Sequence, residues 1–317
     1  MVRITKTLAV LSIAAALPAA GFAQDASKLD RAGITVGTLG NPFFKPLIQG
    51  AEDGLKTGNP NVEITSVGAD YELNKQASQI DSFIGAGAKI IMLNAVDVVA
   101  IKPFVEKAKA AGIIVAAMDV SAEGSDLTVM TNNTQAGNIA CEELAKRLNG
   151  KGDVVIINGP PVSSIIDRVT GCKDAFSKYP DIKVLSDNQD GKGSREGGLA
   201  VMQSLLTRFP KIDAVFGAND PTAIGAELAA KQLNRNEMII AGVDGSPDFL
   251  AGMKQPDSLL VASASQDPYG MAKQAAEAAV KMLETGKAPD PQVTLLDTTL
   301  VTKENVGDQT GWPIPSN

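Results

Sequence analysis

Short apolar runs of strand length recur along this sequence and are separated by stretches with the periodicity of amphipathic helices. The runs extend from ITVGTL (34–39) to LLVASAS (259–265), and most are continuous rather than alternating. Continuous runs are typical of parallel strands that are buried on both faces of a sheet. Strand and helix alternate for nearly the whole chain, which predicts a doubly wound α/β fold. Because one open sheet does not comfortably hold so many strands, we expect two similar lobes.

The first 23 residues have the pattern of a secretory signal peptide. Arg3 and Lys6 precede the apolar run 8–17, and Gly21 and Ala23 are the small residues before a cleavage site. We therefore expect export to the periplasm with cleavage after Ala23, rather than the alternative of a buried N-terminal helix. No later stretch approaches the roughly 18 consecutive apolar residues of a membrane span.

Composition excludes several classes of function. The net charge of −7 argues against binding to nucleic acid or to an anionic membrane. Histidine, the commonest general base and metal ligand, is absent. Ser163 and Ser164 therefore have no histidine partner for a hydrolase, and two cysteines alone cannot complete a four-ligand zinc site. We expect a protein that is not an enzyme and that has no metal and no cofactor.

Polar side chains gather where predicted strands end. In doubly wound sheets, ligands bind beyond the carboxyl ends of the strands. The residues at these ends are Asn41, Asp119, Asn219, Asp244 and Gln266. One such residue is usually a helix cap, but five across both lobes indicate a binding site. Carboxylates accept hydrogen bonds from hydroxyls and amides both donate and accept, which suits a neutral polyhydroxylated ligand.

Two adjacent aromatic residues, Phe43 and Phe44, follow the helix-start signal Asn41-Pro42. Neighbours on a helix point about 100° apart, so one core cannot easily bury both rings. We therefore expect an aromatic ring at the exposed mouth of a helix. Another polar stretch, 186–198, misses the spacings of calcium and phosphate loops and predicts a solvated strand-to-helix loop.

Cys141 and Cys172 are the only cysteines, and each lies in a predicted helix. An exported protein meets an oxidising compartment, so an even count favours a disulfide. Two buried free thiols are the alternative.

Seven motifs in order give the chain a specific resemblance. They are NPFF (41–44), MDV (118–120), IDRVTGCKDAF (166–176), VMQSLL (201–206), GANDPTAIGA (217–226), VDGSPD (243–248) and ASQDP (264–268). Over nearly its whole length after the signal peptide, the chain resembles periplasmic sugar-binding proteins of the ribose-binding family, which serve ABC importers. The resemblance implies two parallel-sheet lobes that are joined by a three-crossing hinge and close around a ligand.

The resemblance also assigns roles to residues. It implies that Phe43 and Phe44 contact the sugar ring, since aromatic rings cover the apolar face of a sugar. It implies hydroxyl-binding carboxylates at Asp119 and Asp244. The remaining polar contacts that it implies are Asn41, Arg168, Asn219 and Gln266.

Two positions depart from the ribose-binding pattern. Ribose-binding members carry Asp-Arg where this chain has Asp119-Val120, and an aromatic residue where it has Gly193. One charged donor and one ring are therefore missing. The departures fit another pentose, a deoxy sugar or an acyclic sugar alcohol better than ribose, and among these we favour a sugar alcohol or a pentose.

By family position, the crossings fall near residues 131–133, 266 and 297. The resemblance thus implies a first lobe of residues 24–131 plus 266–297 and a second of 132–265 plus 298–317. It implies a monomer whose partners are a neutral monosaccharide or sugar alcohol and the permease subunits of an ABC importer. The alternatives are a chemoreceptor ligand-binding protein and an exported enzyme that uses Asp119 and Asp244. A sugar-responsive repressor would need a basic helix-turn-helix at its N-terminus, where this chain has an export signal.

Overall fold

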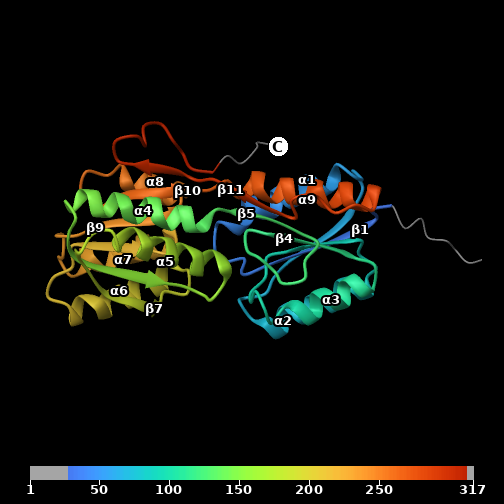
Figure 1. Cartoon of the computed structure of the whole chain (residues 1–317), viewed down its shortest axis with the longest axis horizontal. Helices are drawn as coiled ribbons and strands as arrows, with labels where there is room; N and C mark the ends of the chain where they lie inside the picture. Colours follow the sequence, from blue (N-terminus) through green and yellow to red (C-terminus); the bar gives the residue numbers. More distant parts are fainter. Residues whose placement is uncertain (1–27, 313–317) are drawn as a thin grey trace, which may run out of the picture.

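The computed structural model describes residues 28–312, which form two lobes placed end to end along the long axis of the molecule (Figure 1). The predicted signal peptide (1–23) and the last residues of the tail (313–317) lie outside this range. No helix within it is both long and apolar enough to cross a bilayer. Each lobe is built on one six-stranded sheet.

The first lobe holds an entirely parallel sheet. Its strands are β1 (Arg31–Val36), β2 (Glu63–Gly68), β3 (Ile90–Leu93), β4 (Ile114–Met118), β5 (Leu127–Thr131) and β11 (Val293–Leu296). Their order in the sheet is β11-β5-β4-β3-β1-β2, and every neighbouring pair runs parallel.

The second lobe repeats this design with one antiparallel edge. Its strands are β6 (Lys151–Asn158), β7 (Asp181–Asp190), β8 (Ala214–Gly217), β9 (Ile239–Asp244), β10 (Leu260–Ser265) and β12 (Thr299–Thr302). Their order is β12-β10-β9-β8-β6-β7, and the edge strand β12 pairs antiparallel with β10. The predicted fold of two doubly wound lobes is therefore confirmed, apart from the direction of β12.

Helices cover both faces of each sheet (Figure 1). In the first lobe, α1 (Phe44–Lys56) and α9 (Pro268–Thr285) cover one face, and α2 (Leu73–Gly85) and α3 (Lys102–Ala110) the other. In the second lobe, α4 (Asn133–Arg147) and α5 (Ser163–Phe176) cover one face, and α6 (Arg195–Arg208), α7 (Asp220–Gln232) and α8 (Pro247–Met253) the other.

The continuous apolar runs are explained by this layering. In β3, Ile90 and Met92 pack into the core beneath α1 and α9, whereas Ile91 and Leu93 pack beneath α2 and α3. Successive side chains of a strand point to opposite faces, so a strand covered on both faces needs apolar residues at every position.

The chain passes from one sheet to the other at three places. β5 of the first sheet leads into α4 of the second lobe, β10 of the second sheet leads into α9, and β11 leads into β12. The short segments at these places are residues 132, 266–267 and 297–298. β5, β11 and β12 were not predicted from the sequence, because threonines interrupt their short apolar runs.

Two local predictions were wrong in their boundaries. α1 begins at Phe44, two residues later than the Asn41-Pro42 signal predicted, because residues 41–43 form a turn instead. Asn41 Oδ1 accepts a hydrogen bond from the backbone N–H of Phe43 at 3.0 Å within this turn. In the polar stretch 186–198, β7 continues to Asp190 and α6 begins at Arg195, so the loop contains only residues 191–194.

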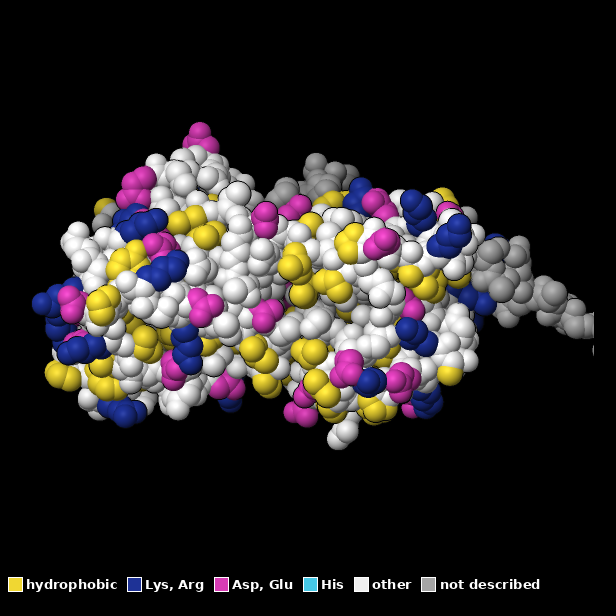
Figure 2. Space-filling view, viewed as in Figure 1, with side chains coloured by type: hydrophobic (Ala, Val, Ile, Leu, Met, Phe, Trp, Pro, Cys, Tyr) yellow, Lys and Arg dark blue, Asp and Glu magenta, His cyan; other side chains and the backbone are white. Residues whose placement is uncertain are grey.

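Charged side chains of both signs are interspersed over both lobes on the face shown in Figure 2. Neither sign dominates this face. This face thus shows no broad basic field of the kind that nucleic-acid binding requires.

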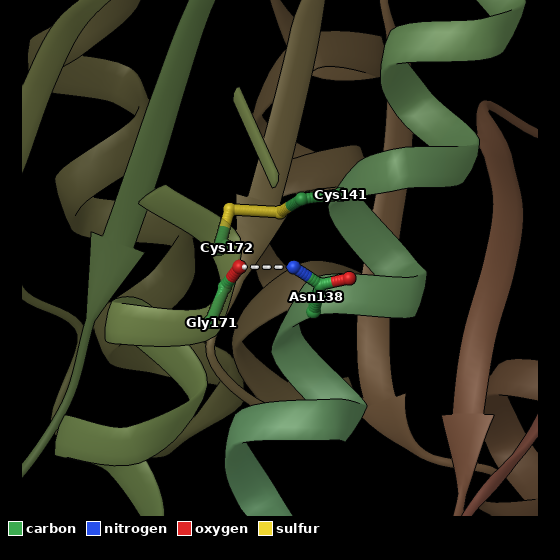
Figure 3. Close-up of a disulfide and its surroundings, with 4 residues drawn as sticks. All are labelled: Asn138, Cys141, Gly171 and Cys172. Carbon is green, nitrogen blue, oxygen red and sulfur yellow. Dashed lines mark hydrogen bonds between the residues drawn. A yellow bond between two sulfur atoms is a disulfide. The ribbon is translucent and has the colours of Figure 1, made fainter. Parts of the chain in front are cut away.

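Helices α4 and α5 are joined by a disulfide between Cys141 and Cys172, whose Cα atoms lie 5.0 Å apart (Figure 3). Beside it, the Asn138 side chain donates a hydrogen bond to the carbonyl oxygen of Gly171 at 3.2 Å. The two helix backbones touch here, since a Cβ on Gly171 would overlap the carbonyl oxygen of Thr134. The disulfide therefore fastens a helix pair that is already in close contact.

We expect the double variant Cys141→Ala/Cys172→Ala to lower the free energy of unfolding. The disulfide closes a loop with a sequence separation of 31, for which the chain-entropy model gives roughly 3–4 kcal/mol. Urea unfolding of the variant, compared with oxidised and reduced wild type, measures this difference. Two free thiols in denatured, unreduced wild type, counted with Ellman's reagent, would show that the disulfide does not form.

Candidate functional site

A cavity lies between the lobes, at the carboxyl ends of the central strands. Both lobes contribute to its wall. The eight residues that the sequence analysis singled out as ligand-binding all line it: Asn41, Phe43, Phe44, Asp119, Arg168, Asn219, Asp244 and Gln266. The structure therefore brings together residues that are more than 200 positions apart in the sequence.

Asp119 projects from the first lobe, directly after β4. Its backbone has a φ of 68°, which is a costly conformation for a residue with a side chain. The side-chain amide of Asn94, which follows β3, donates a hydrogen bond to Asp119 Oδ2 at 2.8 Å. Burial raises the pKa of Asp119 to about 7, although the charge of Arg168 opposes the rise. The carboxyl group is thus held in position with only part of its hydrogen-bonding capacity used.

Asp244 projects from the second lobe, at the end of β9, and has a φ of 138°. Its Oδ1 accepts hydrogen bonds from Gln266 Nε2 at 2.6 Å and from Arg168 Nη1 at 3.3 Å. Burial raises the pKa of Asp244, and the neighbouring guanidinium of Arg168 opposes the rise. Both carboxylates of the site therefore occupy backbone conformations that only surrounding contacts can maintain.

Arg168 reaches the cavity from α5 and is 3% exposed. Its Nε donates to Asn133 Oδ1 at 2.8 Å and its Nη1 to the carbonyl oxygen of Ala218 at 3.1 Å. The close contact of α4 with α5 fixes the position of the Arg168 backbone against α4, because a Cβ on Gly137 would overlap the Arg168 carbonyl oxygen. Most of the N–H donors of the guanidinium thus bond to the protein. The positive charge of Arg168 is paired with the negative charge of Asp244.

The amides of the site have structural partners as well. Asn219 caps α7, because its Oδ1 accepts from the Thr222 N–H at 3.1 Å, and its Nδ2 donates to the Gly193 carbonyl oxygen at 3.0 Å. Gln266 lies in a crossing segment, and its Oε1 accepts from the Thr131 hydroxyl at 2.6 Å. Asn219 therefore caps a helix and also lines the cavity.

Phe43 and Phe44 are both buried, with 5% and 4% of their surface exposed. Their rings pack edge to face with centroids 5.6 Å apart. The expectation of an exposed ring at the helix mouth was wrong, because Phe43 precedes the helix and also packs edge to face on Trp312. Trp312 lies in the C-terminal segment, for which the sequence analysis had no interpretation.

The sequence analysis missed other residues of the wall. They are Tyr71, Asn94, Pro160, Val162, Ser164 and Ile165, beside the two departures Val120 and Gly193. Asn94 directly follows the run KIIML and could have been found by the same strand-end rule as Asp119. Tyr71 follows β2 at a φ of 57° and gave no such signal. Burial and the carboxylates of Asp119 and Asp244 raise the pKa of Tyr71 above its ordinary value, and its hydroxyl stays protonated at neutral pH.

The lobes touch across the cavity mouth. The backbone N–H of Ser121, just after β4, donates to the side-chain oxygen of Ser163 at the start of α5, at 2.9 Å. We refer to this arrangement, in which the two lobes are in contact, as closed. Among residues 28–312, no three His, Cys, Asp or Glu side chains gather in a way that could hold a metal ion. The chemistry that the wall offers is hydrogen bonding to hydroxyls and contact with carbon-bound hydrogens.

Two α/β lobes that close over a polar cavity define a two-lobed solute-binding protein. The chain belongs to the periplasmic binding protein family, whose domain matches residues 32–288. It is 34% identical to the ribose import binding protein of Bacillus subtilis over 259 residues, or 80% of this chain and 82% of that protein. It is 33% identical to the xylitol-binding protein of Mycolicibacterium smegmatis over 247 residues, or 76% and 70% of the two chains.

A solved structure of similar fold is an ABC transporter solute-binding protein from Bacillus halodurans with bound myo-inositol. Its TM-score is 0.79 at 25% identity, and the match covers 88% of this chain and 96% of that one. The predicted family membership is therefore confirmed, and the periplasmic location is that of the family.

The raised pKa of Asp119 predicts that this carboxyl group lowers the free energy of unfolding to an extent that depends on pH. An unfolded Asp titrates near 3.9, so between about pH 4 and pH 7 the folded protein holds a proton that the unfolded chain has lost. Through this group the free energy of unfolding falls as the pH rises through that window. We expect Asp119→Asn to gain stability relative to wild type from pH 5 to pH 8, measured by urea unfolding after removal of bound ligand.

Glu277→Gln, on the exposed side of α9, is the matched control and should show no such trend. A stability difference between Asp119→Asn and wild type that stays constant with pH would contradict the raised pKa.

Proposed function

We propose that this chain is an exported solute-binding protein that captures a small neutral monosaccharide or sugar alcohol and delivers it to an ABC importer. One observation carries the proposal. Carboxylates from both lobes, those of Asp119 and Asp244, line a cavity whose single guanidinium already bonds to Asp244. The names of the relatives, which refer to ribose and xylitol, support the same class of ligand.

The charges of the cavity select against anionic ligands. A carboxylate or phosphate would meet Asp119 and Asp244, and only Arg168 would offset them. An amino acid would need a partner for its carboxylate, and three hydrogen bonds already direct Nε and Nη1 of Arg168 to Asn133, Ala218 and Asp244. Neutral hydroxyls donate to the carboxylates, and a buried bond of this kind contributes about 1.5–3 kcal/mol.

The apolar part of the wall fits the carbon skeleton of such a ligand. Phe43 and Phe44 provide two rings on the first lobe, and we propose that Tyr71 supplies the ring that is missing at Gly193. Val120, which replaces the arginine of ribose-binding members, is 1% exposed and removes a charged donor from the wall. These differences favour a sugar alcohol or a pentose other than ribose.

We propose that the crossings form the hinge on which the lobes open. Thr131, the last residue of β5 before the first crossing, bonds to Gln266 of the second, and Asn132 Nδ2 of the first donates to Asp297 Oδ1 of the third at 3.3 Å. Side-chain hydrogen bonds thus connect the three crossings or the residues next to them. The lobes on either side of this hinge are residues 24–131 plus 266–297 and residues 132–265 plus 298–317. A ligand that contacts both lobes shifts the population toward the closed form, which the importer recognises.

We further propose that the protein is exported through the signal peptide 1–23. It binds its ligand without turnover and is a monomer. The carboxylate pair Asp119 and Asp244 is the feature that an enzyme would have to use. Release of unaltered ligand from the denatured protein, analysed by mass spectrometry, distinguishes binding from turnover.

A thermal-shift panel of pentoses, hexoses, deoxy sugars, sugar alcohols, amino acids and sugar phosphates tests the proposed function. We expect the dominant stabilisation from a neutral sugar or polyol, with about 2.7 kcal/mol at one hundred times its dissociation constant. A dominant shift with an amino acid or a phosphate, and none with any neutral compound, would overturn the proposal.

We expect Asp119→Asn and Asp244→Asn each to weaken binding of the best compound from that panel by about 10- to 100-fold. At pH 8, above the raised pKa of both carboxyl groups, each change removes the negative charge from one acceptor while keeping its shape, which corresponds to about 1.5–3 kcal/mol. Isothermal titration calorimetry measures the affinity, and circular dichroism checks that each variant is folded. Asp81→Asn, on the exposed side of α2, is the control and should bind like wild type. Unchanged affinity in either site variant would remove that carboxylate from the site.

A further inference from the structure

Trp312 is the only tryptophan of the chain, and it lies between the two lobes with 7% of its surface exposed. Its ring is part of the apolar core of the first lobe and meets the Phe43 ring edge to face, with centroids 5.6 Å apart and planes at 82°. Its indole Nε1 donates a hydrogen bond to the backbone carbonyl oxygen of Asp244, in the second lobe, at 2.7 Å. One side chain therefore contacts a proposed ligand-binding residue of each lobe.

The segment that carries Trp312 is attached to the second lobe up to the residue before it. After β12, Val306 packs into the core of the second lobe beneath α7 and α8. Lys254 of the second lobe donates to the carbonyl oxygen of Gln309 at 2.8 Å. Gly311 has a φ of 90°, and a Cβ there would lie 2.6 Å from the backbone nitrogen of Pro247. The chain thus leaves the surface of the second lobe at Gly311 and inserts Trp312 into the first.

We propose that Trp312 is a positioning residue of the ligand site and holds the two lobes in the closed arrangement. The part of this inference that concerns ligand affinity rests on the proposed function, whereas the part that concerns closure does not. Trp312 acts through Phe43, against whose ring it packs edge to face. It also acts through Asp244, because its hydrogen bond holds the Asp244 backbone at an unfavourable φ.

The geometry makes these two contacts dependent on closure. Opening the lobes separates Phe43 from Asp244, so Trp312 must give up one partner or the other. The aromatic pair and the indole hydrogen bond therefore stabilise the closed form over the open form. A protein that is closed for a smaller fraction of the time binds its ligand more weakly in the same proportion.

A purely structural role predicts something different. If Trp312 only filled the core of one lobe, its loss would lower stability but leave the distance between the lobes and the affinity unchanged. Val306→Ala supplies the matched control, because Val306 lies in the same tail and packs only within the second lobe.

Small-angle X-ray scattering of the protein after removal of bound ligand tests closure directly. We expect a larger radius of gyration for Trp312→Ala than for wild type, and no change for Val306→Ala. Trp312→Phe keeps a ring against Phe43 but loses the indole donor. Its radius of gyration should therefore lie between those of wild type and Trp312→Ala. If both Trp312 variants match the wild-type radius, the inference is overturned.

Calorimetry with xylitol, D-ribose and myo-inositol tests the link to the site. For whichever of these compounds binds wild type, we expect at least about tenfold weaker binding in Trp312→Ala and wild-type affinity in Val306→Ala. Acrylamide should also quench the single tryptophan of wild type less when that compound is bound. Unchanged affinity and unchanged quenching would overturn the inference. If wild type binds no neutral sugar or polyol, the proposed function fails and the scattering comparison alone decides the role of Trp312.

Discussion

Asp119 and Asp244 are buried carboxylates that project from opposite lobes into one cavity, and much of the surrounding structure compensates for them. Burying an ionised carboxylate is costly unless hydrogen bonds and an opposite charge accompany it. Asn94 supports Asp119 from the neighbouring strand, and Arg168 and Gln266 support Asp244. Neither carboxylate is saturated by these partners, which leaves acceptors for the hydroxyls of a ligand.

The same contacts connect the site to the crossings between the lobes. Arg168 bonds to Asn133 at the start of α4, and Gln266 bonds to Thr131 at the end of β5. The hydrogen bonds that hold Asp244 therefore extend to two of the three crossings between the lobes. A ligand hydroxyl that donates a hydrogen bond to Asp244 would thus join a hydrogen-bond network that already includes residues of the proposed hinge.

The sequence predicted the fold and many residues of the cavity wall, because both follow from strong local signals. Continuous apolar runs indicated buried parallel strands, and the strand-end rule led to Asp119 and Asp244 without any knowledge of their separation. What it missed depends on tertiary contact. Threonines interrupt the short apolar runs of β5, β11 and β12. Tyr71 follows its strand without a recognisable motif, and the burial of Phe43 depends on Trp312, which is more than 260 residues away.

A crystal structure of the protein grown with the best neutral compound from the thermal-shift panel tests the central claim most directly. The account predicts electron density for one polyhydroxylated molecule in the cavity between the lobes. Its hydroxyls should lie within hydrogen-bonding distance of Asp119 on one side and Asp244 on the other, with its carbon skeleton against Phe43 and Phe44. Density for the compound outside this cavity, or inside it without contact to either carboxylate, would contradict the account.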